Sequence, residues 1–122
     1  MEEIMERREF LTGSLAFALA ALAAPVKAQP ADDHIARAID QINRAIPFGE
    51  EPAHSSSFVQ HIDNAIDHAV LAQRARRNPR IGKAIALLRR ARRVAYGTHL
   101  LSYSRRGAAL ANKALAQLQS VR

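Results

Sequence analysis

The chain has 122 residues, with 18 Lys and Arg against 11 Asp and Glu, and a formal net charge of +7 at pH 7. This length accommodates one small domain, which excludes large multidomain enzymes and receptors. The chain contains no cysteine, which excludes disulfide bonds, thiolate zinc sites, iron–sulfur clusters and thiol nucleophiles.

Residues 1–28 have the three-part layout of an export signal. A charged start is followed by an uncharged stretch rich in Ala and Leu over residues 10–24, and then by small residues at positions 26 and 28 that suit signal peptidase. A transmembrane span needs about 20 apolar residues, so this stretch is too short for a membrane anchor. We therefore expect a cleaved signal peptide and a mature domain over residues 29–122 without a transmembrane span.

The start of this segment also indicates the export route. The string Arg7-Arg8-Glu9-Phe10-Leu11 resembles the core of the twin-arginine (Tat) signal. That resemblance implies export of an already folded protein to a bacterial periplasm.

Charge is strongly segregated along the mature domain. All seven of its acids lie between Asp32 and Asp67, whereas residues 74–122 contain thirteen bases and no acid. The sequence is therefore an electrical dipole, with an acidic first half and a basic second half.

The apolar pattern predicts helices throughout, because a stripe of the form Ile-x-x-Ala-Ile recurs at helical spacing. It occurs at Ile35, Ile62 and Ile81, and a weaker copy begins at Leu110. We expect four helices over residues 32–46, 55–77, 79–96 and 99–119. Amphipathic helices with short connections can bury their stripes only against one another, so the predicted fold is an all-α, antiparallel up-down four-helix bundle.

Proline, glycine and polar residues mark the expected ends of these helices. The breakers between the first two helices are Pro47, Gly49 and Pro52, and a serine at 55, 56 or 57 is expected to cap the second helix. Asn78 and Pro79 are expected as the N-cap and first residue of the third helix. Gly97 should then stop that helix, and Thr98 should cap the fourth.

The five histidines are the candidate ligands, and four of them lie in the acidic half. They are His34, His54, His61, His68 and His99. His61 and His68 are seven residues apart, which places them within about 20° of each other on one flank of a helix. His34 holds the equivalent place in the first copy of the stripe. Histidines at such borders can face each other across a groove and bind Cu(II), Ni(II) or Zn(II), or they can simply pair with a carboxylate or water.

The pattern His61-Ile-x-x-Ala65-Ile66-x-His68, on Ala-rich helices behind an export signal, resembles the small metal-binding proteins of the bacterial periplasm. These are histidine-rich four-helix bundles that take up copper, nickel and other divalent ions. The resemblance implies that His34, His61 and His68 match the family's helix-border histidines, and that His54 and His99 match its histidines near helix starts. It also implies sequestration or buffering of a divalent transition metal, with copper the first candidate.

The third and fourth helices depart from the family pattern. Positions that the family fills with His or Glu hold bases here, namely Arg80, Lys83, Arg89, Arg93, Arg106 and Lys113. Fixed positive charges repel cations, so a retained metal site should lie on the first two helices.

The alternative function is a non-enzymatic interaction module. Its surface would use Arg74, Arg76, Arg77, Arg89, Arg90 and Arg93 to bind an anionic surface or an acidic protein. We do not expect nucleic acid as a partner, because the export signal points outside the cytoplasm and no reader motif is evident. The basic half can also pair with the acidic half inside the bundle. Arg92, close to the apolar stripe, should snorkel or pair with Asp40, Asp63 or Asp67.

No catalytic constellation is evident. Ser102 and Ser104 lie near His99 in sequence, but that half of the chain has no acid to orient the imidazole. Gly-rich phosphate loops and His-Glu-x-x-His are also missing from the sequence. We therefore expect a protein that is not an enzyme. We also expect it to be a monomer.

Overall fold

The computed structural model describes residues 30–121, and within this range it contains four helices and no strand. The first helix covers residues 30–49, and it is followed by α2 (Ser55–Ala75), α3 (Pro79–Ala95) and α4 (Leu101–Gln119). The all-α four-helix prediction is therefore confirmed. The predicted signal peptide, residues 1–28, lies outside the described residues.

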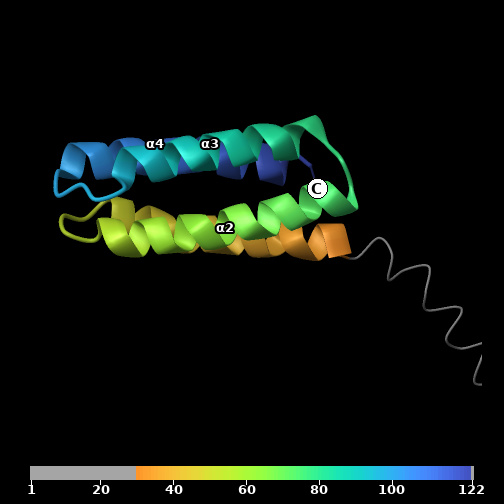
Figure 1. The fold of residues 1–122 in the computed structure, drawn as a ribbon, viewed down its shortest axis with the longest axis horizontal. Helices are drawn as coiled ribbons and strands as arrows, with labels where there is room; N and C mark the ends of the chain where they lie inside the picture. Colours follow the sequence, from red (N-terminus) through yellow and green to blue (C-terminus); the bar gives the residue numbers. More distant parts are fainter. Residues whose placement is uncertain (1–29, 122) are drawn as a thin grey trace, which may run out of the picture. The chain divides into compact units, whose positions relative to one another are not determined.

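The helices form two layers of two (Figure 1). The 30–49 helix and α2 form one layer, and α3 and α4 form the other. The connections over residues 50–54 and 96–100 lie at the same end of the bundle, which we call the two-loop end, and residues 76–78 lie at the opposite end. Within residues 30–121, no helix combines the length and apolarity needed to cross a bilayer.

The core consists of the predicted stripes. Ile35, Ile62 and Ile81 have no exposed surface, and the alanine three residues after each of them is equally buried. More than half of the buried hydrophobic residues are alanine, and the largest fully buried side chain is Phe58. Because alanine is small, the helices approach one another closely.

The end of the first helix corrects one prediction. We expected Pro47 to end this helix at residue 46, but the helix continues to residue 49. A proline near a helix end removes only the hydrogen bond to the carbonyl four residues earlier, here that of Asn43. Asn43 is exposed, so water can satisfy its carbonyl. The chain turns only where the Glu50 N–H donates to the Pro47 carbonyl at 3.1 Å.

The start of α2 corrects a second prediction. We expected a serine cap, but the N-cap is His54 and no side chain caps the helix. The Ser55 hydroxyl instead donates to the Thr98 carbonyl at 2.8 Å. The serine therefore ties together the two connections of the two-loop end, a contact distant in sequence that local capping rules do not include.

The predicted boundary between α2 and α3 is confirmed in its chemistry. The Asn78 side chain accepts a hydrogen bond from the Arg80 N–H at 2.8 Å, and Pro79 is the first residue of α3. Gly97, with a φ of +70°, follows the end of α3 in the left-handed conformation that favours glycine. The Thr98 hydroxyl accepts from the Leu100 N–H at 3.1 Å, but α4 starts at Leu101 with Leu100 as its N-cap. Thr98 therefore precedes the N-cap rather than occupying it.

Close packing is most evident where α4 faces the rest of the bundle. A Cβ atom on Gly107 would lie 3.1 Å from Cε2 of Phe58, 3.2 Å from the Ala91 carbonyl oxygen and 3.3 Å from Cβ of Ala95. All three distances are tight, and the Ala91 atom belongs to the backbone, which cannot turn aside. Gly107 is therefore the residue that lets α4 approach α3.

We predict that Gly107→Ala lowers the free energy of unfolding by about 1–3 kcal/mol, because overpacking outweighs the better helix propensity of alanine. Gly82→Ala is the matched control, since Gly82 is also helical and its Cβ would meet only Nε2 of Gln73, at 3.4 Å. This control should be neutral or stabilising by up to about 1 kcal/mol. Urea unfolding followed by circular dichroism measures both, and equal effects of the two substitutions would contradict the packing argument.

Candidate functional site

Three contacts join the border of the 30–49 helix to the border of α2, and each includes a histidine of the α2 segment. They are His34 with His68, Gln41 with His61, and Phe48 with His54. Each contact is seven residues from the next on both segments, with numbers rising along one helix as they fall along the other. We call these contacts rungs. They show that the histidine spacing 54, 61, 68 is a heptad that lines one groove.

The first rung brings two imidazoles together. Nδ1 of His34 lies 3.2 Å from Nδ1 of His68, and both residues are half-buried. The ring centroids are 5.4 Å apart with 27° between the planes. Because the nitrogens are much closer than the centroids, they lie between the rings, which meet edge to edge. One Nδ1–H donates to the other Nδ1, so this contact has room for one proton and not two.

The surroundings of this rung favour neutral imidazole. Burial lowers the pKa of His68, and the positive charges of His34 and Arg37 lower it further, while Asp67 opposes them. Neutral imidazole is the form that binds metal ions. The environment of His68 therefore keeps a ring nitrogen available as a ligand near neutral pH.

The second rung is a hydrogen bond. Nδ1 of His61 lies 2.8 Å from Oε1 of Gln41, and because that amide oxygen only accepts, His61 donates from Nδ1. The ring of Phe48 stacks on the His61 ring with centroids 5.7 Å apart and 7° between the planes. His61 is thus held in one orientation, with Nδ1 engaged in the groove.

The third rung is a contact between rings. The rings of Phe48 and His54 have centroids 5.8 Å apart with 34° between the planes. His54 is exposed, and its Nε2 lies 3.6 Å from Oε1 of Glu51. Phe48 therefore contacts both His54 and His61, so this rung contributes only one imidazole.

His99 is separate from the rungs. It is exposed on the connection before α4 and lines a pocket between α2 and α3. Of the five histidines predicted as ligands, the structure brings together His34 and His68 as a pair of imidazoles. Across residues 30–121, no three His, Asp or Glu side chains converge as a cluster that could hold a metal ion.

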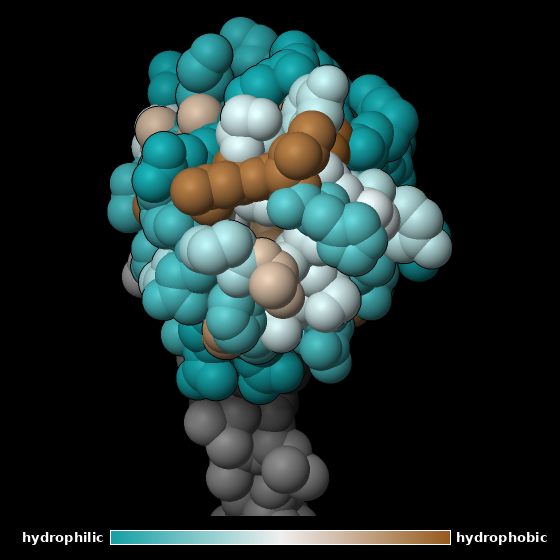
Figure 2. Space-filling view, turned by 90° about the vertical axis from the view of Figure 1, so that its left-hand side faces the viewer, coloured by the Kyte–Doolittle hydropathy of each residue, from teal (hydrophilic) through white to brown (hydrophobic). Residues whose placement is uncertain are grey.

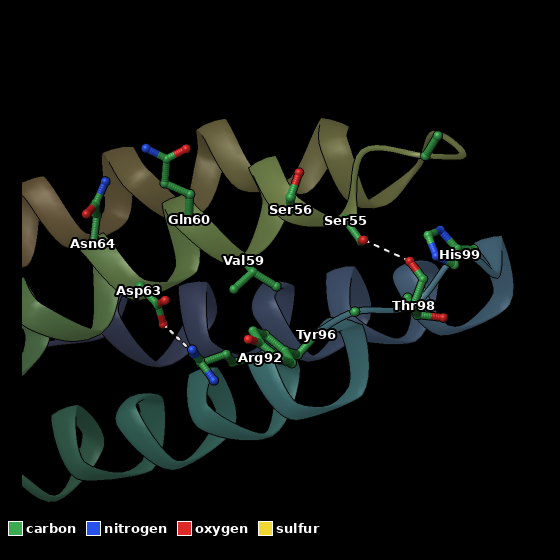
Figure 3. Close-up of a pocket in the computed structure, with 12 residues that line it drawn as sticks. Ser55, Ser56, Val59, Gln60, Asp63, Asn64, Arg92, Tyr96, Thr98 and His99 are labelled. Atoms are coloured by element: carbon green, nitrogen blue, oxygen red, sulfur yellow. Dashed lines mark hydrogen bonds and ion pairs between the residues drawn. The ribbon is translucent and has the colours of Figure 1, made fainter.

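The pocket has a volume of about 800 Å³ and extends from the connections of the two-loop end along α2 and α3 to Asn64 and Arg92. Its apolar part includes Val59 and Tyr96, and Gln60 and Asn64 belong to its polar lining (Figure 3). The side chains of Gln60 and Asn64 point away from α3 in this view, whereas Val59 points toward Tyr96. The pocket is therefore a groove with an apolar floor and a polar upper edge.

An ion pair links the two layers beside this groove. Nε of Arg92 lies 2.6 Å from Oδ1 of Asp63, and the guanidinium lies over the Tyr96 ring, 4.9 Å from its centroid (Figure 3). The prediction that Arg92 snorkels or pairs with one of three aspartates is thus confirmed for Asp63. Both charges are partly exposed, so the pair contributes at most about 1 kcal/mol.

The fold turns the charge pattern of the sequence into a difference between layers. All seven acids of residues 30–121 lie in the 30–49 helix, α2 or the connection between them, whereas α3 and α4 contain only bases. Three ion pairs join the basic half to the acidic half, namely Arg76 with Asp32, Arg92 with Asp63 and Arg105 with Glu50. Pairing within the bundle therefore accounts for some of the bases. Of those predicted to bind an anionic partner, five are exposed and pair with no described carboxylate: Arg74, Arg77, Arg89, Arg90 and Arg93.

Gln41, Phe48 and Tyr96 take part in these contacts but were not candidates in the sequence. The seven-residue spacing of His54, His61 and His68 was the sequence feature that could have revealed the rungs. Residues that contact these histidines from the facing helix must have the same spacing. Nothing comparable marks the pocket, whose residues come from α2, α3 and both connections of the two-loop end.

Comparison with protein-family models, with curated proteins and with solved structures finds no match to this chain.

The shift at His68 predicts a pH dependence of stability. Its pKa in the folded protein is below the ordinary value of 6.5, so between these two pKa values the unfolded chain binds more protons at this residue. The contribution of His68 to the free energy of unfolding is therefore complete above pH 6.5 and is lost as the pH falls from 6.5 through the lower pKa of the folded protein. Urea unfolding at a series of pH values from about 8 to about 5 measures the loss.

His68→Gln should flatten this dependence, because glutamine does not titrate. His99→Gln is the matched control, since His99 is exposed, and it should leave the dependence unchanged. An unchanged slope in His68→Gln would show that the acid sensitivity arises elsewhere.

Proposed function

We propose that this protein is an exported, antiparallel four-helix bundle that binds a divalent transition metal through His34 and His68, for sequestration or buffering in the periplasm. Copper is the first candidate, with nickel and zinc as alternatives. The observation that carries the proposal is the 3.2 Å separation of the two Nδ1 atoms on facing helices.

This separation fits two imidazoles on one ion. With metal–nitrogen distances of about 2.0–2.1 Å, two ligands of a tetrahedral ion lie about 3.3 Å apart. The Nδ1 lone pairs lie along the line between the two rings, so both rings must turn about their side-chain torsions to direct the lone pairs to one ion beside that line. The folded bundle already aligns the two helices that carry these ligands, so metal binding does not have to order them.

Metal and proton compete for this rung. In the hydrogen bond one imidazole carries its proton on Nδ1, and a metal that uses both Nδ1 lone pairs requires this proton to move to Nε2 of the same ring. The lowered pKa of His68 reduces the competition from further protonation. Binding should therefore weaken as the pH falls, because a protonated imidazole has no lone pair left for the metal.

The site should be of moderate affinity. Two imidazoles are its protein ligands, and water would complete the coordination. Arg37, whose charge already acts on His68, also repels a cation. Reversible binding of this kind suits a buffer better than a permanent cofactor site.

The antiparallel arrangement rests on the rungs and on the connections. From one rung to the next, the residue number rises on the 30–49 helix and falls on α2. Successive connections lie at alternate ends of the bundle (Figure 1). This arrangement sets His34, near the start of one helix, beside His68, near the end of the next.

The binding test uses calorimetry of the full chain with Cu(II), Ni(II) and Zn(II) in the presence of glycine as a competing chelator. Combined His34→Ala and His68→Ala should weaken binding by about tenfold or more, equivalent to at least about 1.4 kcal/mol. Combined His54→Ala and His99→Ala is the matched control, since it removes two exposed imidazoles. Full binding after the first change would rule out the site.

The rung pattern also predicts how to create a second site. Gln41→His would place an imidazole opposite His61, one heptad or about 10 Å along the groove from the first rung. The number of ions bound per chain should then rise from about one to about two. Asn43→His adds a histidine to the exposed side of the same helix and serves as the control. Equal gains from both variants would contradict the rung geometry.

A further inference from the structure

Large apolar side chains are exposed together at the two-loop end. Tyr96 is 64% exposed, Leu100 is 58% exposed and Tyr103 is 41% exposed. These residues lie within eight positions of one another, on the C-cap of α3, the following connection and the first turn of α4. The remaining large hydrophobic residue of comparable exposure within residues 30–121, Leu71, lies on α2.

Figure 2 looks onto this end of the bundle. Hydrophobic surface forms a strip across its upper half, the side on which α3 and α4 lie in Figure 1, and hydrophilic residues surround the strip. An apolar strip with a polar rim is the form that surfaces for protein or membrane contacts take.

The rim on this side is basic. Arg93, Arg105 and Arg106 are exposed close to the strip in sequence, and the Arg106 guanidinium lies over the Tyr103 ring, 5.4 Å from its centroid. Two acids lie on the 50–54 connection at the same end. Glu50 is 3.9 Å from Nε of Arg105 and Glu51 is 3.6 Å from Nε2 of His54, so both lie beside basic groups.

We propose that the two-loop end docks on an anionic phospholipid bilayer, with Leu100, Tyr96 and Tyr103 at the headgroup level and the bases of α3 and α4 toward the phosphates. Tyrosine rings favour the membrane–water interface, because one end of the ring is apolar and the other is polar. Each base near an anionic surface adds attraction that salt screens. Apolar exposure and positive charge thus lie on the same side of the molecule.

A lipid surface explains this end better than nucleic acid does. The phosphates of a nucleic acid and those of a bilayer both attract basic side chains. Only a bilayer or another apolar surface takes Leu100 out of water, and Leu100 has the second largest exposed fraction of the four exposed large hydrophobic residues. The proposal is independent of metal binding, because the rungs lie in the groove between the other two helices.

The test uses the two tyrosines as probes, since they are the only Tyr residues of the chain and it has no Trp. Tyrosine emission therefore reports this end alone, even in the full chain. Vesicles of phosphatidylglycerol and phosphatidylcholine are added, and quenching of the emission by acrylamide is measured. We expect quenching to fall with anionic vesicles, not to fall with pure phosphatidylcholine, and to recover as salt shortens the Debye length from about 10 Å at 0.1 M to about 3 Å at 1 M.

Variants test the apolar and the charged parts separately by vesicle co-sedimentation. Leu100→Ser should weaken binding by about tenfold, the effect of keeping one leucine in water, whereas Leu71→Ser should leave binding unchanged. Combined Arg93→Gln and Arg106→Gln should weaken binding by about fivefold for each charge removed. Arg44→Gln, in the acidic layer, is the control.

Three outcomes would overturn the proposal. Co-sedimentation with unchanged tyrosine quenching would mean that another part of the chain binds lipid. Equal losses from Leu100→Ser and Leu71→Ser would remove the role of the strip. Protection of the tyrosines by double-stranded DNA but not by anionic vesicles would assign the basic layer to nucleic acid.

Discussion

The small side chains of the core determine how close the helices lie, and the other features follow from that distance. With alanine at more than half of the buried hydrophobic positions and glycine at residue 107, the helices approach until backbone and side chain touch, as they do around Phe58. Border residues of adjacent helices then come within hydrogen-bonding reach. Contacts of 3.2 Å between His34 and His68, and of 2.8 Å between Gln41 and His61, depend on this closeness.

A core made of small residues also leaves chemistry to the borders. Among residues 30–121, the one buried polar side chain is that of Ser104. Ligands, ion pairs and aromatic contacts therefore lie in the grooves between helices and at the bundle ends, where they are half-buried. Groups in such positions keep part of their hydration, so their interactions are moderate.

The sequence was sufficient to predict what depends on helix period and local capping. The angle of Arg92 beside the apolar stripe led to its partner Asp63, and Asn78 with Pro79 marked the start of α3. The meeting of border histidines was foreseen, but the rung partners were not, because periodicity gives a direction around a helix and not the axial offset between two helices. That offset decides that His68 meets His34 while His61 meets Gln41.

The wrong predictions share a cause. Pro47 and Ser55 were interpreted by local rules, but the helix tolerates Pro47 near its end, and Ser55 bonds to Thr98, 43 residues away. Tertiary contacts compete with local ones, and a single sequence shows only the local competitor. The pocket was not predicted for the same reason, since it combines residues from separate segments.

The charge difference between the two layers acts before any contact forms. A body with opposite signs on its two long sides experiences a torque near a charged plane, and this torque turns it while it is still about a Debye length away. Near a negative plane, the side formed by α3 and α4 rotates inward and the acidic side rotates outward. This torque selects the basic side during the approach, and the exposed Leu100 then tilts the two-loop end toward the plane.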